Sequence, residues 1–425
     1  MVDDTQTLRQ IARQRMLLRR VVGLLATVPI PQFAFALTGA NVAALVLLPL
    51  RTMAGWPRHI KSLLWLSVLG VVLLAASALV QGVGLQNIVL VSTVSFALML
   101  ACAVKVTDGA RTGTQFLIWT CVGTVAFFLL IPLENSPDTF AHLWKYGIAV
   151  PIALVAVAIV SESSTRRFWP IALLLGIGAT SVFLGFRSHG LVCIAVVLLL
   201  FAKGASNTRR SAFLKILFAG VLFAAASVLL PAAIASGFFG ETVRARTEEQ
   251  LTSGASLLLS GRVEPPLSIA AVLARPWFGW GNLNAIDAAT IAAGQQIAGQ
   301  LGLQDPSAYM SLWVRSDGRV SVHSVLFEAW VQGGIFAALG PLFMIFLFAA
   351  AIVRVQGQLS PIVVLVSVQG IWDVLFSTWG AQRPGLLAVS IVVAAWAITE
   401  RRGLDFGRMK RPRFSAAPMR VAALG

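Results

Sequence analysis

The chain has 425 residues, of which 57% are hydrophobic and 12% charged, and its mean hydropathy is +0.83. Soluble domains contain about 25% charged residues, so this composition excludes a water-soluble globular protein and predicts a helical protein that crosses a membrane many times. The formal net charge of +16 does not favour nucleic acid as a partner, because the sequence contains no basic soluble domain that would bind it.

Apolar runs predict twelve membrane-spanning helices. Prolines and Gly39 divide residues 21–50 into two spans, and the polar stretch 187–190 divides residues 168–200. The predicted spans cover residues 21–37, 38–50, 63–81, 87–105, 114–132, 146–161, 168–185, 190–202, 213–236, 324–353, 360–379 and 384–399.

The distribution of Lys and Arg predicts the orientation of these spans. Cytoplasmic connections of membrane proteins accumulate Lys and Arg. With twelve spans and a cytoplasmic N-terminus, 24 of the 33 Lys and Arg residues fall on the inner side. The net charge is then mostly inner-face charge that sets orientation and contacts anionic membrane lipids. We therefore predict an all-α integral membrane protein with both termini in the cytoplasm.

This topology divides the chain into five regions and leaves one large loop on the outer side. The predicted regions are a cytoplasmic N-terminal tail (1–20), nine spans (21–236), the outer loop (237–322), three spans (323–400) and a basic cytoplasmic tail (401–425). A membrane protein with a single large extramembrane segment is expected to have its chemistry there, so the outer loop is the predicted catalytic region.

Several local elements are predicted within the outer loop. Pro265 and Pro266 suit the first turn of a short apolar helix that ends at Ala274. A glycine-rich aromatic turn follows at 277–282, and residues 285–303 have a weak helical pattern. Asp317 and Gly318 predict a tight turn between two short apolar segments.

Three basic residues on the outer side are candidates for substrate contact. Arg187 lies between two predicted spans, Arg262 precedes the short apolar helix, and His323 begins the tenth span. Two arginines at a membrane surface can clamp a diphosphate through forked hydrogen bonds. A histidine titrates near neutral pH and can take a proton from an attacking hydroxyl. The alternative readings are interface arginines and a polar helix cap.

Acidic residues within the spans and the absence of metal motifs complete this picture. Glu328 and Asp373 lie in apolar runs, where they position substrate, conduct protons or bond between helices. No acidic or histidine cluster predicts a metal site, no glycine loop predicts a nucleotide cofactor, and Cys102, Cys121 and Cys193 lie inside apolar runs. We expect neither a metal nor a cofactor.

The outer loop and its flanks resemble the O-antigen ligase and polymerase family. Three segments support the resemblance: Gly261-Arg262 before a helix, Arg275-Pro276-Trp277-Phe278-Gly279-Trp280-Gly281, and His323-Ser324-Val325-Leu326-Phe327-Glu328 followed by Gly333-Gly334-Ile335. Arg187-Ser188 resembles the upstream arginine motif of the family. The chain departs from the family pattern at Ser324, where asparagine is usual, at Phe186, where serine is usual, and at His189, where small residues are common.

The resemblance implies a metal-independent inverting glycosyltransferase of the bacterial inner (cytoplasmic) membrane, with its active site facing the periplasm. Such an enzyme moves a glycan from undecaprenyl diphosphate to a hydroxyl acceptor. By this resemblance Arg187 and Arg262 hold the diphosphate and His323 acts on the acceptor hydroxyl. Arg275, Arg319 and Glu328 are candidate secondary substrate contacts.

Four functional alternatives remain open on the sequence. A ligase uses a sugar of the lipid A core as acceptor, whereas a polymerase for O-antigen or exopolysaccharide uses a second lipid-linked glycan. A transporter or flippase of lipid-linked glycan would use Asp373 and Glu328 as coupling groups, and it predicts a symmetry between chain halves that we do not find. A noncatalytic assembly scaffold predicts that the loss of His323 leaves activity intact.

Overall fold

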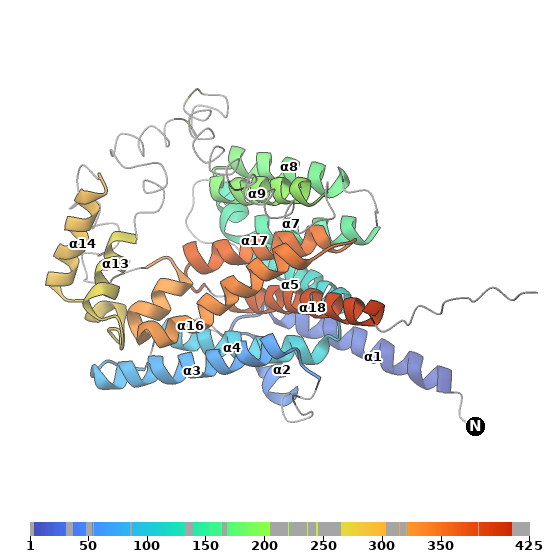
Figure 1. Ribbon diagram of the computed structural model, residues 1–425, viewed down its shortest axis with the longest axis horizontal. Coiled ribbons are helices and arrows are strands. Elements are labelled where there is room, and N and C mark those ends of the chain that lie inside the picture. The colour runs from blue at the N-terminus through green and yellow to red at the C-terminus, as the bar shows by residue number, and fades with distance from the viewer. Residues whose placement is uncertain are drawn as a thin grey trace, which may run out of the picture.

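The computed structural model is a bundle of helices, and the axes of its longest helices are roughly aligned with one another (Figure 1). The structure describes residues 4–30, 37–47, 53, 55–85, 87–131, 139–163, 168–204, 220, 236, 244, 265–302, 314, 320, 322–380 and 382–409. Over these residues the regular structure is helical, and β-type pairing is confined to two isolated bridges.

The helices in chain order are α1 (Asp4–Leu25), α2 (Gly39–Leu47), α3 (Arg58–Val80), α4 (Ile88–Val106), α5 (Ala110–Leu130), α6 (Thr139–Leu143), the π-helix η3 (Trp144–Ile148), α7 (Ala149–Ser163), α8 (Phe168–Phe183), α9 (Arg187–Gly204), α13 (Pro265–Ala274), the 3-10 helix η4 (Leu283–Ala285), α14 (Ala288–Gln300), α16 (Val325–Arg354), α17 (Ser360–Phe376) and α18 (Arg383–Met409).

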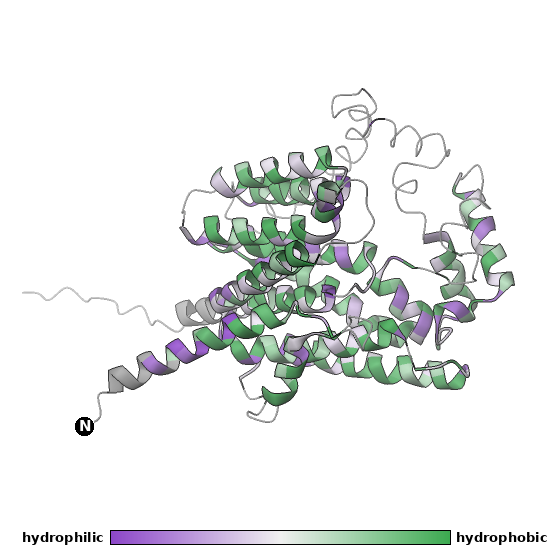
Figure 2. Ribbon diagram, turned by 180° about the vertical axis from the view of Figure 1, so that it is seen from behind, coloured by the Kyte–Doolittle hydropathy of each residue, from purple (hydrophilic) through white to green (hydrophobic). Residues whose placement is uncertain are grey.

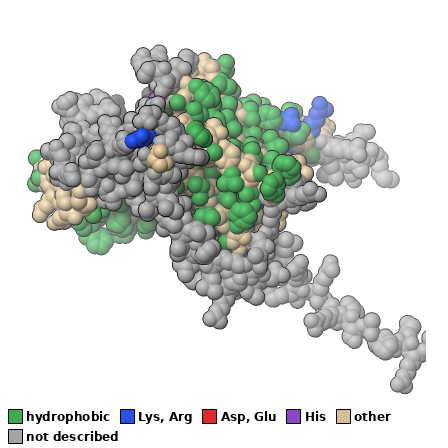
Figure 3. All heavy atoms as spheres, turned by 90° about the horizontal axis from the view of Figure 1, so that it is seen from above, with side chains coloured by type: hydrophobic (Ala, Val, Ile, Leu, Met, Phe, Trp, Pro, Cys, Tyr) green, Lys and Arg blue, Asp and Glu red, His purple; other side chains and the backbone are tan. Residues whose placement is uncertain are grey.

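Six of the described helical segments are long and apolar enough to cross a membrane: Arg58–Val80, Ile88–Val106, Ala110–Leu130, Phe140–Ser163, Val325–Arg354 and Arg383–Glu400. Apolar residues predominate along the bundle helices, whereas α1 and α14 contain hydrophilic stretches (Figure 2). Leu130 is 80% exposed and Val80 is 81% exposed, which suits contact with lipid rather than water. Hydrophobic side chains also cover much of the described surface on the face shown in Figure 3.

Helix α16 lies at the centre of the packing. It contacts α3 along one side and α17 along another, while α18 packs against α4 and α5. Small residues allow close approach between helices: a Cβ atom on Gly370 of α17 would lie 2.3 Å from the ring of Phe348 in α16. Such packing is how helices associate in lipid, where the hydrophobic effect does not drive them together.

One end of the bundle collects the connections that the charge pattern assigns to the cytoplasm. Glu400 of α18 accepts a hydrogen bond from the backbone N–H of Ala110 at 2.7 Å. The Arg111 Nε atom lies 3.9 Å from Oε1 of Glu162 at the end of α7. The Lys203 ammonium of α9 donates a hydrogen bond to the carbonyl of Ile352 in α16. We call this the Glu400 end.

The opposite end contains α13 and α14, and we call it the α13 end (Figure 1). Four connections lie toward this end: the α3–α4 turn, the α8–α9 turn, the start of α16 and the α17–α18 turn. The other terminus of each of these helices lies toward the Glu400 end. Helices that follow one another at these turns therefore run in opposite directions through the described bundle.

The first two helices differ from the predicted spans 21–37 and 38–50. Helix α1 begins at Asp4, within the predicted tail 1–20, and ends at Leu25, whereas the first span was predicted at 21–37. Residues 4–20 contain neither glycine nor proline and are rich in the good helix formers Leu, Arg and Gln, so the helix starts early. A bridge between Pro29 and Thr38 separates α1 from α2, which has nine residues and is too short to span a bilayer. The predicted span 213–236 falls outside the described residues except at 220 and 236.

Two helices predicted within the outer loop are present in the structure. Helix α13 begins at Pro265 and ends at Ala274, and α14 lies within the predicted helical stretch 285–303. Val314 and Val320 form an antiparallel bridge on either side of the predicted turn, although the turn itself lies outside the described residues. Helices α13 and α14 share a small hydrophobic core with α16 that includes Leu267, Trp280 and Val331.

Asp287 fixes the start of α14, which allows a first prediction. Its side chain accepts a hydrogen bond from the Thr290 backbone N–H at 2.8 Å, and that bond, with a second from the Thr290 hydroxyl, lowers the pKa of the Asp287 carboxyl. Because the pKa is lower in the folded state, the stabilisation is present above the unfolded pKa of about 3.9 and is lost as pH falls through the folded pKa. We expect Asp287→Ala to accelerate amide hydrogen exchange in α14 at pH 7.

Asp287→Asn is the matched control, because asparagine caps helices without titrating in this range. Its exchange in α14 is expected to stay close to that of the unmodified protein and to lack the acid dependence. Equal acceleration by both substitutions would contradict the capping role.

Candidate functional site

Arg187 is the first residue of α9 and lies at the α13 end of the bundle. The preceding turn is tight: the Gly185 backbone has φ +76°, and the Phe186 N–H donates to the Ser181 carbonyl at 2.7 Å. The Arg187 side chain is half-buried. Two residues later His189 is buried and stacks on the Phe186 ring at 5.3 Å. His189, at a position where the family resemblance leads one to expect a small side chain, is thus packed against the turn between α8 and α9.

His323 is half-buried and stands immediately before the cap of α16. The Ser324 hydroxyl accepts a hydrogen bond from the Phe327 N–H at 3.2 Å and contacts the Val374 carbonyl at 3.2 Å. The Val325 N–H donates to the Ser377 carbonyl at 2.9 Å. These bonds fix the backbone beside His323 to the end of α17. Ser324, a departure from the family pattern, therefore acts here as a helix cap.

Glu328 lies one turn into α16 and is 5% exposed. Its Oε2 accepts a hydrogen bond from the Trp379 backbone N–H at 3.3 Å. Asp373, the other acidic residue predicted within a span, is half-buried and accepts from the Ser377 hydroxyl at 3.1 Å. Both carboxylates thus border the α17–α18 turn, and His323 lies beside the same turn.

Arg275 belongs to a different group of contacts at the same end. Its Nη1 donates to Gln81 Oε1 at 2.6 Å, and its guanidinium lies 4.0 Å from the centroid of the Trp280 ring. The Trp280 side chain is 2% exposed, and its indole N–H donates to the Ala271 carbonyl at 3.0 Å. The arginine therefore joins α13 to the end of α3, and a substrate contact by it stays a prediction.

The aromatic glycine turn docks on a break in α16. The Trp280 N–H donates to the Val331 carbonyl at 2.8 Å and the Gly281 N–H to the Gln332 carbonyl at 2.9 Å, while the Ile335 N–H donates to the Pro276 carbonyl at 2.9 Å. Helical hydrogen bonding is interrupted there because Gly334 has φ 77° and ψ −178°. Backbone groups freed by the break are thus bonded by the turn, as burial within a bundle demands.

Two residues with contacts at the α13 end of the bundle were not singled out from the sequence. Asn87 caps α4 through the Val89 N–H, and its amide donates to the Gly281 carbonyl at 3.1 Å and to the side chain of Gln332. An asparagine before an apolar run is a recognisable helix-cap signal, but nothing local indicates its partners far along the chain. Arg383, the first residue of α18, was likewise not singled out, and it donates to the Thr378 carbonyl in the α17–α18 turn.

Two candidate residues, Arg262 and Arg319, lie outside the described residues. The other four, Arg187, Arg275, His323 and Glu328, all lie at the α13 end. Within the described part of the chain, no group of three or more His, Cys, Asp and Glu side chains is arranged to hold a metal ion.

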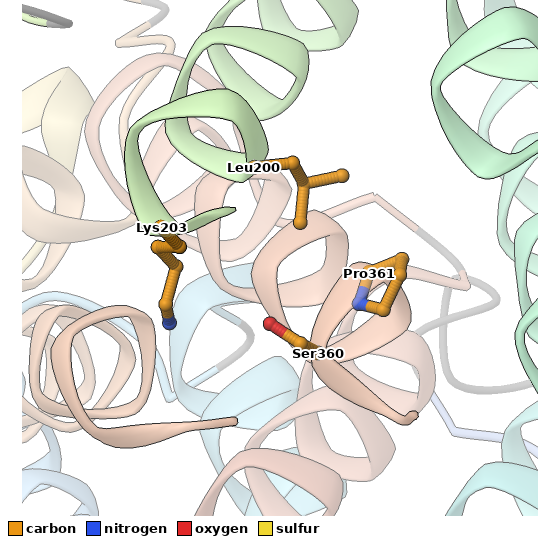
Figure 4. Close-up of a pocket in the computed structure, with 4 residues that line it drawn as sticks. All are labelled: Leu200, Lys203, Ser360 and Pro361. Carbon is orange, nitrogen blue, oxygen red and sulfur yellow. The ribbon is translucent and has the colours of Figure 1, made fainter. Parts of the chain in front are cut away.

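A small crevice at the opposite end of the bundle is lined by Leu200, Lys203, Ser360 and Pro361 (Figure 4). The Lys203 ammonium donates to the carbonyl of Ile352 in α16, so it bonds to a backbone carbonyl in the last turn of that helix. Nothing in this crevice parallels the polar groups at the α13 end.

The apolar helices and their exposed hydrophobic surface define an α-helical membrane protein. Comparison of the chain with protein-family models, with curated proteins and with solved structures gave no match.

Proposed function

We propose that the protein is a membrane glycosyltransferase that moves a glycan from undecaprenyl diphosphate to a hydroxyl acceptor at the outer face of a bacterial inner membrane. The observation that supports this best is the position of His323. It lies at the same end of the bundle as Arg187 and the outer helices α13 and α14, beside the buried Glu328. In the proposed topology this end faces the periplasm.

The proposed chemistry requires positioning and charge stabilisation rather than a cofactor, because diphosphate is already a good leaving group. The acceptor hydroxyl attacks the anomeric carbon of the glycan, and the bond from that carbon to the diphosphate oxygen breaks. His323 takes the hydroxyl proton. Arg187 and Arg262 hold the diphosphate and offset its charge as it leaves.

Reconstitution in proteoliposomes tests the proposal and separates its alternatives. Purified protein receives lipid-linked repeat units, either alone or with lipid A core. Chain growth without the core indicates a polymerase, and transfer that requires the core indicates a ligase. Movement of the lipid-linked glycan across the bilayer without a new glycosidic bond would contradict the proposal and favour a flippase.

The proposed diphosphate clamp predicts the effect of Arg262→Lys. An ammonium group cannot reproduce the two parallel hydrogen bonds of a guanidinium, so we expect transfer to fall by on the order of 100-fold. The measurement is the initial rate of glycan transfer in the reconstituted system.

Arg111→Lys is the matched control, because Arg111 is exposed at the Glu400 end. Its transfer rate is expected to remain unchanged. Wild-type activity of the Arg262→Lys protein would remove the clamp from the proposal.

A further inference from the structure

The α17–α18 turn, described at residues 377–380 and 382, is held against the first turn of α16. The Ser377 carbonyl accepts from the Val325 N–H at 2.9 Å, and the Trp379 N–H donates to Glu328 at 3.3 Å. From the far side of the turn, Arg383 Nη1 donates to the Thr378 carbonyl at 3.0 Å. The turn therefore lies between Arg383 and the segment that begins at His323.

Three polar side-chain atoms in this turn are buried and have no hydrogen-bond partner among the described residues. The Trp379 side chain is 4% exposed, and none of the described residues accepts a hydrogen bond from its indole N–H. The amide nitrogen and the amide oxygen of Gln382 are also buried and lack partners among the described residues. Buried polar groups in proteins are almost always bonded, so three such atoms in one turn indicate that something else binds them.

Three other buried or half-buried indoles donate their N–H to a protein acceptor, unlike that of Trp379 among the described residues. The Trp280 N–H donates to the Ala271 carbonyl at 3.0 Å, the Trp330 N–H to the Pro276 carbonyl at 3.1 Å, and the Trp396 N–H to the Thr107 hydroxyl at 3.1 Å. Trp379 contacts the Phe96 ring, with 6.0 Å between centroids, so its ring is fixed by packing while its N–H is left for another partner.

The chemistry of the turn selects among ligand groups. The indole N–H and the Gln382 amide nitrogen donate, whereas the Gln382 oxygen accepts. Donors and an acceptor together suit hydroxyl groups, which both donate and accept, better than an oxyanion, which only accepts.

We infer that the turn formed by Trp379, Gln382 and Arg383 beside Glu328 is a carbohydrate subsite that binds sugar hydroxyls rather than phosphate. This inference rests on the proposed function, since it assigns the turn to the glycan of the lipid-linked substrate. It is a binding role: Trp379 and Gln382 contact the sugar, while Glu328 and Arg383 hold the turn in place.

The test compares two probes on the intact protein in lipid nanodiscs. One probe is an undecaprenyl-diphosphate-linked oligosaccharide and the other is undecaprenyl diphosphate without sugar. Trp379→Phe removes the indole N–H and retains an aromatic ring against Phe96. Gln382→Met removes both polar atoms at similar side-chain length. We expect each substitution to weaken binding of the glycan probe roughly threefold to tenfold and to leave binding of the sugar-free probe unchanged.

Trp396→Phe is the matched control. It also removes an indole N–H, but from a bonded indole at the Glu400 end, so we expect unchanged binding of both probes. Thermal melting of each variant checks that it is folded, and either site variant alone suffices for the comparison.

Every outcome bears on the inference. Equal weakening of both probes would assign the turn to the diphosphate and overturn it. Unchanged binding of both probes to both site variants would mean that water alone bonds these atoms, and it would overturn the inference while leaving the proposed function intact. Failure of the unmodified protein to bind either probe would overturn both.

Discussion

Replacing Gly334 with alanine is expected to prevent stable folding of the bundle or to lower its stability severely. The backbone there has φ 77° and ψ −178°, a conformation essentially restricted to glycine. A Cβ atom would also lie 1.9 Å from the Trp277 carbonyl oxygen. Backbone strain and overpacking together cost about 2–6 kcal/mol, which approaches the whole stability of many proteins. The measurement is reversible unfolding in mixed micelles, or the yield of folded protein after extraction.

Gly302→Ala separates strain from crowding. Gly302 follows α14 with φ +89°, but a Cβ atom there has no neighbour within 4 Å. Its substitution is expected to cost only the backbone term, about 1–3 kcal/mol. If both variants lost the same stability, the close docking of the 276–281 turn on α16 would not be the reason for the glycine at 334.

The docked turn explains why two glycine motifs occur far apart in the chain. Gly279 has φ +68°, and a Cβ atom on it would lie 2.6 Å from the Gln332 carbonyl. Gly281 has φ +73°, and a Cβ atom on it would lie 2.9 Å from the Cα atom of Ala78 in α3. Discontinuous helices in membrane proteins often bind ligands at the break. Here the protein's own backbone bonds to the broken helix, so the break positions the outer helices relative to the site.

Much of the helical framework was predictable because bilayer thickness imposes a length on apolar segments. The segments 63–81, 87–105 and 324–353 coincide closely with α3, α4 and α16. Helices α13 and α14 were predictable from prolines and weak periodicity. The start of α1 was not, since its arginines suggested an aqueous tail, although arginine is a good helix former.

For the proposed site, the sequence could indicate only which candidate residues share an end of the bundle. Alternation of charge indicated that Arg187 and His323 share an end, and the described helices have that arrangement. Sequence spacing could not reveal that Glu328 bonds to Trp379 or that Asn87 bonds to Gly281, because these contacts join distant turns. Trp379 and Gln382 have no local motif, and only their burial without partners draws attention to them.

His323→Ala is expected to reduce glycan transfer by on the order of 10²–10⁴-fold while the lipid-linked donor still binds. The alanine cannot take the proton of the acceptor hydroxyl, and general-base catalysis typically contributes a factor of this size. Transfer is measured with reconstituted protein, and donor binding is measured separately on the same preparation. His323→Gln is expected to lose transfer equally, because an amide can bond to a hydroxyl but cannot serve as a base at neutral pH.

Two further variants distinguish catalysis from helix capping. Ser324→Ala removes the cap of α16 and is expected to cost about 1 kcal/mol of stability, with transfer largely retained in the folded protein. His142→Ala removes a half-buried histidine whose ring contacts that of Tyr146, with 4.6 Å between centroids, and we expect little effect on transfer. A catalytic base requires that only the changes at His323 abolish transfer without loss of fold. If His323→Ala retained full transfer, the proton would have another acceptor, and the position of His323 would no longer support the proposed glycosyltransferase over a scaffold.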